Sequence, residues 1–270
     1  MKRKITILTI AFLSSMLMYA NAFAAATGRC GDSITWTLDD SGNLTLSGSG
    51  EMWNYGYVTS PFKDYGIKTV TIEYGITSIG DYVFRGCCGM TELTLPNSVT
   101  SIGDCAFYGC TGLTELILPN SVRSIGDIAF TYCSGLEKIT VESGNSCYDS
   151  RDNCNSIIDT EFNTLIVGCK NSVIPNSVTS IGYYAFYGCS GLTELTLPDS
   201  VASIGDGAFI CCSDLSKITS LAEIPPVCGR GVFDRVNKTN CELIVPIVSV
   251  TAYKQAEVWN EFSNIRAFPE

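Results

Sequence analysis

Hydrophobic residues recur along this chain with a period of 23 residues. Copies that begin with Ser-Ile-Gly start at Ser78, Ser101, Ser124, Ser180 and Ser203. In the second copy the apolar positions are Ile102, Ala106, Phe107, Cys110, Leu113, Leu116, Leu118 and Val122. A period of this length indicates a solenoid, because one coil cannot bury its own apolar edge, whereas stacked coils bury a continuous core.

Within each unit the pattern predicts two short extended segments joined by a turn. Residues 113–118 alternate between inward apolar and outward side chains and end at Pro119, which is typical of a short strand. The segment around Ser124 is a second extended piece, and residues 104–110 form a tight turn or a single helical turn. Stacking of such coils places equivalent strands side by side in parallel sheets.

An insertion at residues 147–172 interrupts the repeat. It separates Ser124 from Ser180 by 56 residues, which is two periods plus ten. Its sequence SIID, followed by TEFN and TLIVGC, predicts a β-hairpin. Insertions into repeat arrays tend to lie on one face and alter recognition there. A tolerated loop without a partner is the alternative.

The repeat resembles the BspA-like leucine-rich repeat family over residues 60–220. The matching features are the segments LPNSVTSIG and AFYGC and the shared period. Residues 30–52 and the segment from IPPVCG to SNI are similar to the segments that flank this family's repeats. The resemblance implies a leucine-rich repeat solenoid: a right-handed, β-rich α/β superhelix of about 23-residue coils with parallel strands, capped at both ends.

The flanking segments predict a cap at each end of the solenoid. We expect an N-terminal β-cap at residues 27–60, the solenoid at 61–220 and a C-terminal cap at 221–270. Caps are needed because the end coils would otherwise expose core and strand edges. In the N-terminal cap, DDSGN is a hairpin turn between ITWTL and LTLSG. In the C-terminal cap we expect a strand at 243–245 and a helix at 249–259.

Residues 1–26 have the three-part layout of a secretory signal peptide. Three basic residues precede an apolar run over residues 5–19, and cleavage is expected near Ala24 to Ala26. A membrane anchor is the alternative, although the run is shorter than the roughly 20 residues that a spanning helix needs. We therefore expect a secreted or cell-surface protein with no membrane span in the mature chain.

The chain is acidic. Removal of the three basic residues at the start would change the formal net charge from -10 to -13. A charge of this sign repels nucleic acid and anionic lipid at long range, so we expect neither as a partner.

The 14 cysteines fall into two groups. Five occupy the same position of successive repeats, and we call them the thiol ladder: Cys87, Cys110, Cys133, Cys189 and Cys212. We interpret them as buried free thiols that pack as compact hydrophobes. Outside the ladder, the possible disulfide is Cys228 with Cys241, which bracket 12 residues of the C-terminal cap. Cys147, Cys154 and Cys169 are further disulfide candidates in or beside the insertion.

The chain has no histidine, which excludes Ser-His-Asp and Cys-His nucleophilic systems and His-containing zinc sites. The outward strand position carries Glu92, Glu115 and Glu194, yet nothing sets two of these carboxylates apart as an acid and base pair. The chain contains no phosphate-binding loop, dinucleotide fingerprint or EF-hand loop. We therefore expect a non-enzymatic protein with no catalytic residue, cofactor or bound metal.

Tyrosines gather near the repeat turn and are candidates for a recognition surface, because tyrosine is well suited to contact surfaces. They are Tyr82, Tyr108, Tyr132, Tyr184 and Tyr187, and the glutamates of the outward strand position are candidates with them. The alternative for the tyrosines is partial packing between adjacent coils.

The hypothesis that follows is a monomeric recognition or adhesion protein that presents its repeat surface to an extracellular protein or glycan. The resemblance supports this class of role, because members of the family are secreted or surface proteins and several are linked to adhesion, including binding of host matrix proteins. Two alternatives remain: an accessory, substrate-binding component of a system that degrades extracellular polymers, and a passive structural protein of the envelope.

Overall fold

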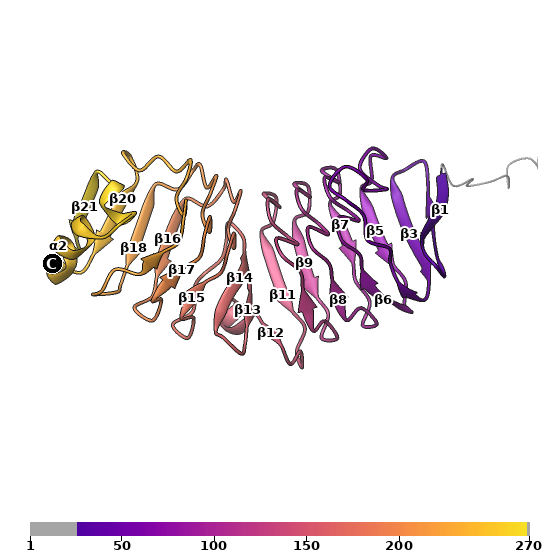
Figure 1. Cartoon of the computed structure of the whole chain (residues 1–270), viewed down its shortest axis with the longest axis horizontal. Helices are drawn as coiled ribbons and strands as arrows, with labels where there is room; N and C mark the ends of the chain where they lie inside the picture. Colours follow the sequence, from indigo (N-terminus) through magenta and orange to yellow (C-terminus); the bar gives the residue numbers. More distant parts are fainter. Residues whose placement is uncertain (1–25, 269–270) are drawn as a thin grey trace, which may run out of the picture.

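The protein is an elongated stack of coils (Figure 1). The computed structural model describes residues 26–268, so the expected signal peptide lies outside the described residues except for Ala26, which begins β1 (Ala26–Gly31). The chain advances along the longest axis of the molecule from the indigo end to the yellow end. Each coil therefore contacts mainly the coils before and after it, as expected of a solenoid.

Repeated coils contribute strands to two faces of the stack. The long strands are β5 (Thr69–Ile72), β7 (Glu92–Thr94), β9 (Glu115–Leu118), β11 (Lys138–Val141), β16 (Glu194–Leu197), β18 (Lys217–Ser220) and β20 (Glu242–Val245). The short strands are β6 (Ile76–Ile79), β8 (Ser101–Ile102), β10 (Ser124–Ile125), β15 (Ser180–Ile181), β17 (Ser203–Ile204) and β19 (Val227–Cys228).

Neighbouring strands pair in parallel with a shift of one repeat. In β9 and β11, Glu115 lies opposite Lys138 and Leu116 lies opposite Ile139. The alternation along β9 buries Leu116 and Leu118 and exposes the residues between them, as the sequence predicts.

The N-terminal end begins with an antiparallel meander. β1 pairs with β2 (Ile34–Leu38), and β2 pairs with β3 (Asn43–Gly48) across the predicted DDSGN turn. β3 then pairs in parallel with β5, while β4 (Gly50–Glu51) pairs with β6, so the meander covers the first repeat coil.

The insertion contains the predicted hairpin and one additional strand. β13 (Ser156–Asp159) pairs antiparallel with β14 (Thr164–Gly168). The additional strand is β12 (Tyr148–Asp149), which pairs with β13 and precedes the 3-10 turn η2 (Arg151–Asn153). β14 pairs in parallel with β15, which returns the chain to the repeat stack.

The helix expected at residues 249–259 is shorter in the structure. After the 3-10 turn η3 (Ile247–Ser249), the helix α2 covers only Val250–Gln255, and Ala256 is extended with φ −74° and ψ 136°. A second 3-10 turn, η4 (Trp259–Glu261), follows. Tyr253 and Trp259 are both fully buried, and residues six apart lie on different sides of a helix. The helix therefore ends so that both rings can enter the core of the cap.

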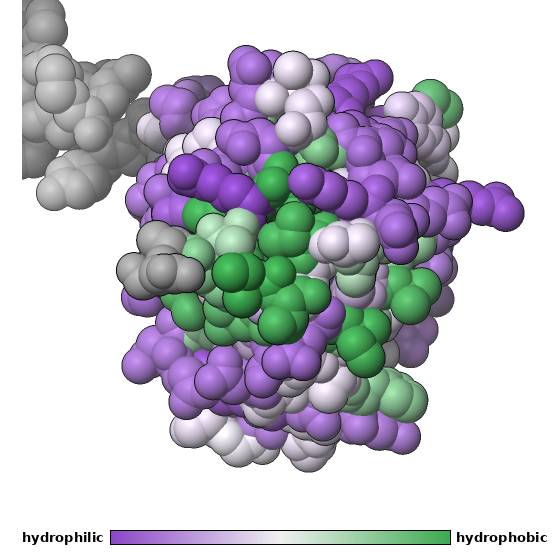
Figure 2. All heavy atoms as spheres, turned by 90° about the vertical axis from the view of Figure 1, so that its left-hand side faces the viewer, coloured by the Kyte–Doolittle hydropathy of each residue, from purple (hydrophilic) through white to green (hydrophobic). Residues whose placement is uncertain are grey.

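The C-terminal end is closed by hydrogen bonds from those two rings and by a last strand. The Tyr253 hydroxyl lies 2.7 Å from the Ser220 hydroxyl, and the Trp259 indole donates to the Pro226 carbonyl at 2.8 Å. β21 (Asn264–Ala267), which the sequence pattern does not predict, pairs in parallel with β20. Figure 2 shows apolar side chains in the centre of this end face within a hydrophilic rim.

Phenylalanine rings stack into two columns inside the solenoid. The first column joins Phe62, Phe84, Phe107 and Phe130 with ring centroids 5.2 to 5.3 Å apart. The second joins Phe186, Phe209 and Phe233 at 5.0 and 5.4 Å. Burial of each ring contributes roughly 1.5–3 kcal/mol to folding. The columns belong to two separate hydrophobic cores, and the boundary between these cores lies at the insertion.

None of the helices within residues 26–268 is both long enough and apolar enough to cross a lipid bilayer.

Candidate recognition site

The turn after each short strand is tied to the next coil by backbone hydrogen bonds. The Cys105 amide donates to the Asp127 carbonyl at 3.0 Å, and the Phe107 amide donates to the Ala129 carbonyl at 2.8 Å. The Gly109 amide makes a third bond of this kind. The same three bonds recur in the coils that begin at residues 78, 180 and 203, so regular turns leave no amide of this set unpaired.

An aspartate side chain adds a fourth bond between regular coils. The Asp81 carboxylate accepts the Asp104 amide at 2.9 Å, and the Asp104 carboxylate accepts the Asp127 amide at 2.8 Å. The Asp206 carboxylate accepts the Arg230 amide in the same way.

The insertion removes one turn from the stack. Gly168 lies four residues after Thr164, whereas Phe107 lies six residues after Ser101, so β14 runs straight to Gly168 where other coils bend through Gly-Asp. The Gly168 amide donates to the Ala185 carbonyl at 2.8 Å, the bond that a phenylalanine amide makes elsewhere. A side chain is excluded at this position, because a Cβ atom on Gly168 would lie 2.2 Å from the Phe186 ring.

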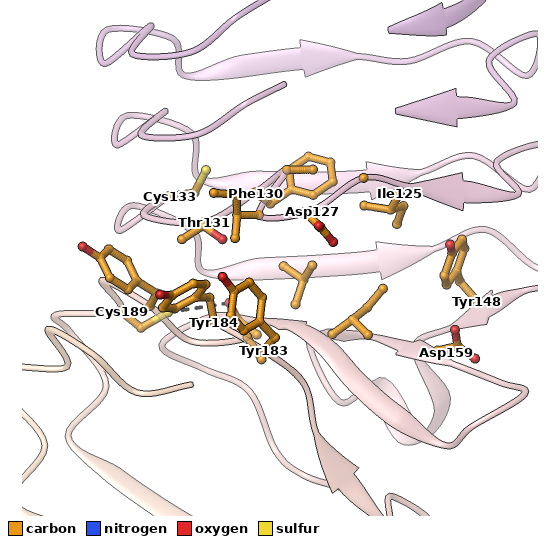
Figure 3. A pocket seen from close by; sticks show the side chains of 18 residues that line it. Ile125, Asp127, Phe130, Thr131, Cys133, Tyr148, Asp159, Tyr183, Tyr184 and Cys189 are labelled. Atoms are coloured by element: carbon orange, nitrogen blue, oxygen red, sulfur yellow. Dashed lines mark hydrogen bonds between the residues drawn. The ribbon is translucent and has the colours of Figure 1, made fainter. Parts of the chain in front are cut away.

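The missing turn leaves a cavity of about 220 Å³, which we call the junction cavity. It lies between the turn at residues 125–133 and the turn at residues 183–189. Figure 3 shows Asp127 on one wall and Tyr183 and Tyr184 on the opposite wall. Side chains from the insertion, Tyr148 and Asp159, lie at the far end of the cavity (Figure 3).

The backbone amides around the junction cavity that have no hydrogen-bond partner within residues 26–268 include those of Ile128, Phe130 and Tyr183. The Ile128 and Phe130 amides occupy the positions that donate to the next coil in regular turns, and the Tyr183 amide occupies the position that donates to an aspartate. The Asp127 carboxylate is the member of the aspartate series that accepts no amide in the described chain. Because unpaired amides are costly, such groups require water or a ligand.

The backbone at Ile128 is strained. Its φ is 50°, and the equivalent residue of a later coil is Gly207, with φ 63°. A β-branched residue seldom adopts this conformation, but positive φ recurs at this repeat position in Tyr82, Cys105 and Tyr184, so it belongs to the repeated turn and not to the cavity alone.

Four of the five predicted tyrosines come together beside the junction cavity. They form the tyrosine cluster with Tyr183, and its members are Tyr108, Tyr132, Tyr183, Tyr184 and Tyr187. Ring centroids lie 6.3 Å apart for Tyr108 and Tyr132, 5.7 Å for Tyr132 and Tyr187, 5.4 Å for Tyr184 and Tyr187, and 4.0 Å for Tyr183 and Tyr184. The cluster therefore joins the coils on the two sides of the insertion.

Other details of the tyrosines differ from the expectation. Tyr132 is 40% exposed, whereas Tyr108, Tyr184 and Tyr187 are half-buried against their neighbours. Tyr82 lies apart from the cluster, beside the Cys105 thiol. Tyr183 was not predicted; the available signal is that it replaces the aspartate of the regular Ser-Ile-Gly-Asp segment.

The phenols of Tyr108 and Tyr183 remain protonated at neutral pH. Burial, followed by the neighbouring Tyr187, raises the pKa of Tyr108 to about 12. Burial and a contact with Tyr184 also raise the pKa of Tyr183. Each of these phenols can therefore both donate and accept a hydrogen bond.

The glutamates predicted to share the recognition surface lie on the long strands and do not line the junction cavity. Glu115 forms an ion pair with Lys138 at 2.6 Å, and Glu194 forms one with Lys217 at 3.1 Å. Glu92 is exposed at the start of β7. These pairs are solvent-exposed, so each contributes at most about 1 kcal/mol.

The thiol ladder is in register along the inside of the stack. The Cys110 thiol donates to the Phe84 carbonyl and the Cys133 thiol donates to the Phe107 carbonyl, both at 3.2 Å. All five ladder thiols are free and buried. Burial raises the pKa of Cys87 and of Cys212 to about 12. Because the thiolate is the nucleophile and the metal ligand, these cysteines are poorly suited to either role at neutral pH.

The possible disulfide between Cys228 and Cys241 is not formed in this structure. Both thiols are free. Cys228 ends β19, in the sheet of short strands, whereas Cys241 immediately precedes β20, in a different sheet on the long-strand face. The segment between the two cysteines therefore runs from one face of the coil to the other. The cysteines of the insertion, Cys147, Cys154 and Cys169, are free as well.

Residues 26–268 contain no group of three or more cysteine, aspartate or glutamate side chains arranged to hold a metal ion.

The family model described as the BspA type leucine rich repeat region matches six copies, over residues 59–164 and 155–234. The chain belongs to this family. The two matched ranges of the BspA-type array meet within the β13–β14 hairpin, so repeats of the same type lie on both sides of the insertion. The junction cavity therefore lies at a local break in the regular stacking of a single array.

A solved structure of a bacterial leucine-rich repeat protein has the same fold. A leucine rich cell surface protein from Faecalibacterium prausnitzii A2-165 is 20% identical with a TM-score of 0.54, and the match covers 93% of this chain and 97% of that chain. A leucine-rich repeat protein from Eubacterium ventriosum ATCC 27560 is 22% identical with a TM-score of 0.43, covering 90% and 85%. No curated protein matches the chain.

Proposed function

We propose that this BspA-type protein is a non-enzymatic recognition protein, secreted or held at a cell surface, that binds an extracellular protein or glycan. The observation that carries the proposal is the tyrosine cluster. Five tyrosines from three coils meet beside an open cavity. Clustered tyrosines are typical of contact surfaces, because they combine a large apolar ring with a hydrogen-bonding group.

The cluster is held on a rigid frame. The Tyr132 amide donates to the Tyr187 carbonyl at 3.0 Å, which fixes the two turns against each other at their tips. Little conformational entropy is therefore lost when a ligand binds, and preorganisation of this kind favours affinity.

The extracellular location rests on two supports. The first is the signal-peptide pattern of residues 1–26. The second is the similarity of the fold to that of the leucine rich cell surface protein from Faecalibacterium prausnitzii A2-165. For the non-enzymatic role, the support is the absence of histidine from the sequence and the pairing of Glu115 and Glu194 with lysines.

Binding of the mature chain to an array of matrix proteins and glycans tests the proposal. We expect at least one ligand to be retained, and Tyr132→Ala and Tyr187→Ala to weaken its binding by about tenfold or more, since truncation of a central aromatic contact typically costs at least about 1.4 kcal/mol. Tyr74→Ala is the matched control, because Tyr74 is 79% exposed and lies outside the cluster.

Two results would contradict this function. One is a ligand that binds both cluster variants as well as the unchanged protein. The other is an array without binding together with turnover of a glycan or peptide, which would favour the role in a polymer-degrading system. A protein that neither binds nor turns over any substrate would favour the passive structural role.

A further inference from the structure

We propose that the junction cavity is a binding site for one neutral saccharide ring, such as the terminal pyranose of a glycan. The inference deepens the proposed function and rests on it. It also adds something that the array of repeats does not imply, because the site exists only where the insertion removes a turn.

The size of the cavity limits the ligand. Its volume is about 220 Å³, below the roughly 300–1,000 Å³ of pockets that take drug-sized molecules. A single six-membered ring with its substituents fits this range, whereas an extended oligomer would have to leave the cavity after its first unit. The walls are fixed, because the Tyr132 to Tyr187 bond holds the outer side and the Gly168 to Ala185 bond holds the inner side.

The unpaired polar groups set the chemistry of the ligand. The free amides of Ile128, Phe130 and Tyr183 are available to acceptors, and the exposed, free carboxylate of Asp127 is available to donors. Hydroxyl groups donate and accept at once, so a polyhydroxylated ring can meet both requirements.

Charged ligands meet only half of these requirements. A phosphate or sulfate would accept from the amides but would be repelled by Asp127 and by Asp159 at the end of the cavity. A cation would be attracted by the carboxylates but would leave the three amides without acceptors. A neutral ligand is the class that satisfies both sets of groups.

Two aromatic rings complete the site. Tyr183 and Tyr184 lie on the wall opposite Asp127 (Figure 3), and Tyr183 is 53% exposed. An aromatic ring offers an apolar face to the carbon-bound hydrogens of a sugar, while its neutral hydroxyl remains available to the sugar hydroxyls. The wall of tyrosines and the wall of polar groups thus match the two kinds of surface on a pyranose.

The direct test is titration of the isotope-labelled mature chain with the methyl pyranosides of glucose, galactose, mannose and N-acetylglucosamine, followed by backbone NMR. We expect at least one sugar to shift the amide signals of Ile128, Phe130 and Tyr183, because these amides gain an acceptor. We also expect Asp127→Ala to weaken binding of that sugar at least tenfold without lowering the melting temperature, since no amide depends on this carboxylate.

Asp81→Ala is the matched control. It removes the same charge at the same repeat position two coils earlier, where its carboxylate holds the Asp104 amide and lies outside the cavity. We expect it to lower the melting temperature and to leave sugar binding within about twofold of the unchanged protein.

The outcomes separate this inference from the proposed function. If none of the four sugars shifts the signals of the three amides, the cavity holds water only and the proposed saccharide site is wrong. Equal binding by Asp127→Ala, or tighter binding of a sulfated sugar, also overturns it. If a matrix protein nevertheless binds and Tyr132→Ala weakens it, the recognition function stands without this site.

Discussion

Cysteine satisfies two requirements at its position in the coil, and both concern a single side chain. It is small enough to lie between the stacked phenylalanine column and the backbone of the previous coil, and its thiol donates to a carbonyl there. Alanine would leave the carbonyl with one partner fewer, and a larger residue would separate the coils. The repetition of cysteine is therefore explained by packing together with a weak hydrogen bond.

The buried thiols predict that the protein loses stability in alkaline solution. The pKa of Cys87 and of Cys212 is about 12 in the folded protein, against an ordinary value of 9.0. Between these values the folded protein holds protons that the unfolded chain releases, so the stabilisation is complete below pH 9 and declines as the pH rises toward 12. Each thiol removes about 1 kcal/mol per pH unit in this window.

Urea unfolding at pH 7.5, 9 and 10.5 measures the effect. Tyrosines with raised pKa values add to the decline, so the double variant Cys87→Ala and Cys212→Ala is the control and should show a shallower dependence above pH 9. A free energy of unfolding that stays constant or rises from pH 9 to 10.5 would refute the prediction.

At the residue scale, side chains that follow the repeat could be predicted from the sequence, whereas side chains that depart from the repeat could not. Four tyrosines of the cluster were predicted because each occurs near the repeated turn. Tyr183 was missed because it occupies a position where the repeat has aspartate, and only the three-dimensional stack shows that its ring lies beside Tyr184. The expected Cys228–Cys241 pairing has the same limit, since sequence distance does not show which face of the coil a residue reaches.

Among the elements, the β13–β14 hairpin has the largest effect on the molecule. Its strands and turn were predictable from alternating apolar residues, but its consequence depends on where β14 ends. The strand stops at Gly168 against the Phe186 ring, and this contact places the next coil. The added strand β12, with two residues, and the last strand β21 carry no repeat signal and pair with elements brought to them by the fold.

Gly168→Ala should destabilise the protein, because the new Cβ atom would overlap the Phe186 ring at 2.2 Å. The expected loss is about 1–3 kcal/mol, the range for overpacking in a closed core. Gly56→Ala is the control, since a Cβ atom there meets only the Thr59 hydroxyl at 3.4 Å. Thermal unfolding of the two variants measures the difference; equal melting temperatures would show that the hairpin does not rest on this contact.

At the scale of the whole stack, residues 26–268 contain two hydrophobic cores in one continuous array. In a solenoid, stability is the sum of coil stabilities and the interfaces between neighbours, so a weak interface divides the cooperative unit. The junction lacks two of the three backbone bonds that join regular turns, those from the Ile128 and Phe130 amides. The weakest interface of the described array therefore lies at the insertion.

We expect the two cores to unfold in separate steps. Hydrogen exchange, followed by mass spectrometry in increasing urea, should give residues 69–141 and residues 194–245 different free energies of opening. Phe107→Ala should lower protection mainly in the first range and Phe209→Ala mainly in the second, since each ring belongs to one column. A single loss of protection over both ranges, shared by both variants, would show that the junction transmits cooperativity fully.

The tip bond between Tyr132 and Tyr187 makes the junction cavity independent of the number of coils around it. Both walls are built from the two coils that flank the insertion, while the remaining coils serve only to stack. Addition or removal of one regular coil would move the cavity along the axis by one strand spacing, about 4.8 Å, and leave its walls unchanged. The distance between the cavity and either end of the array can therefore change in steps of one repeat, while the cavity itself stays the same.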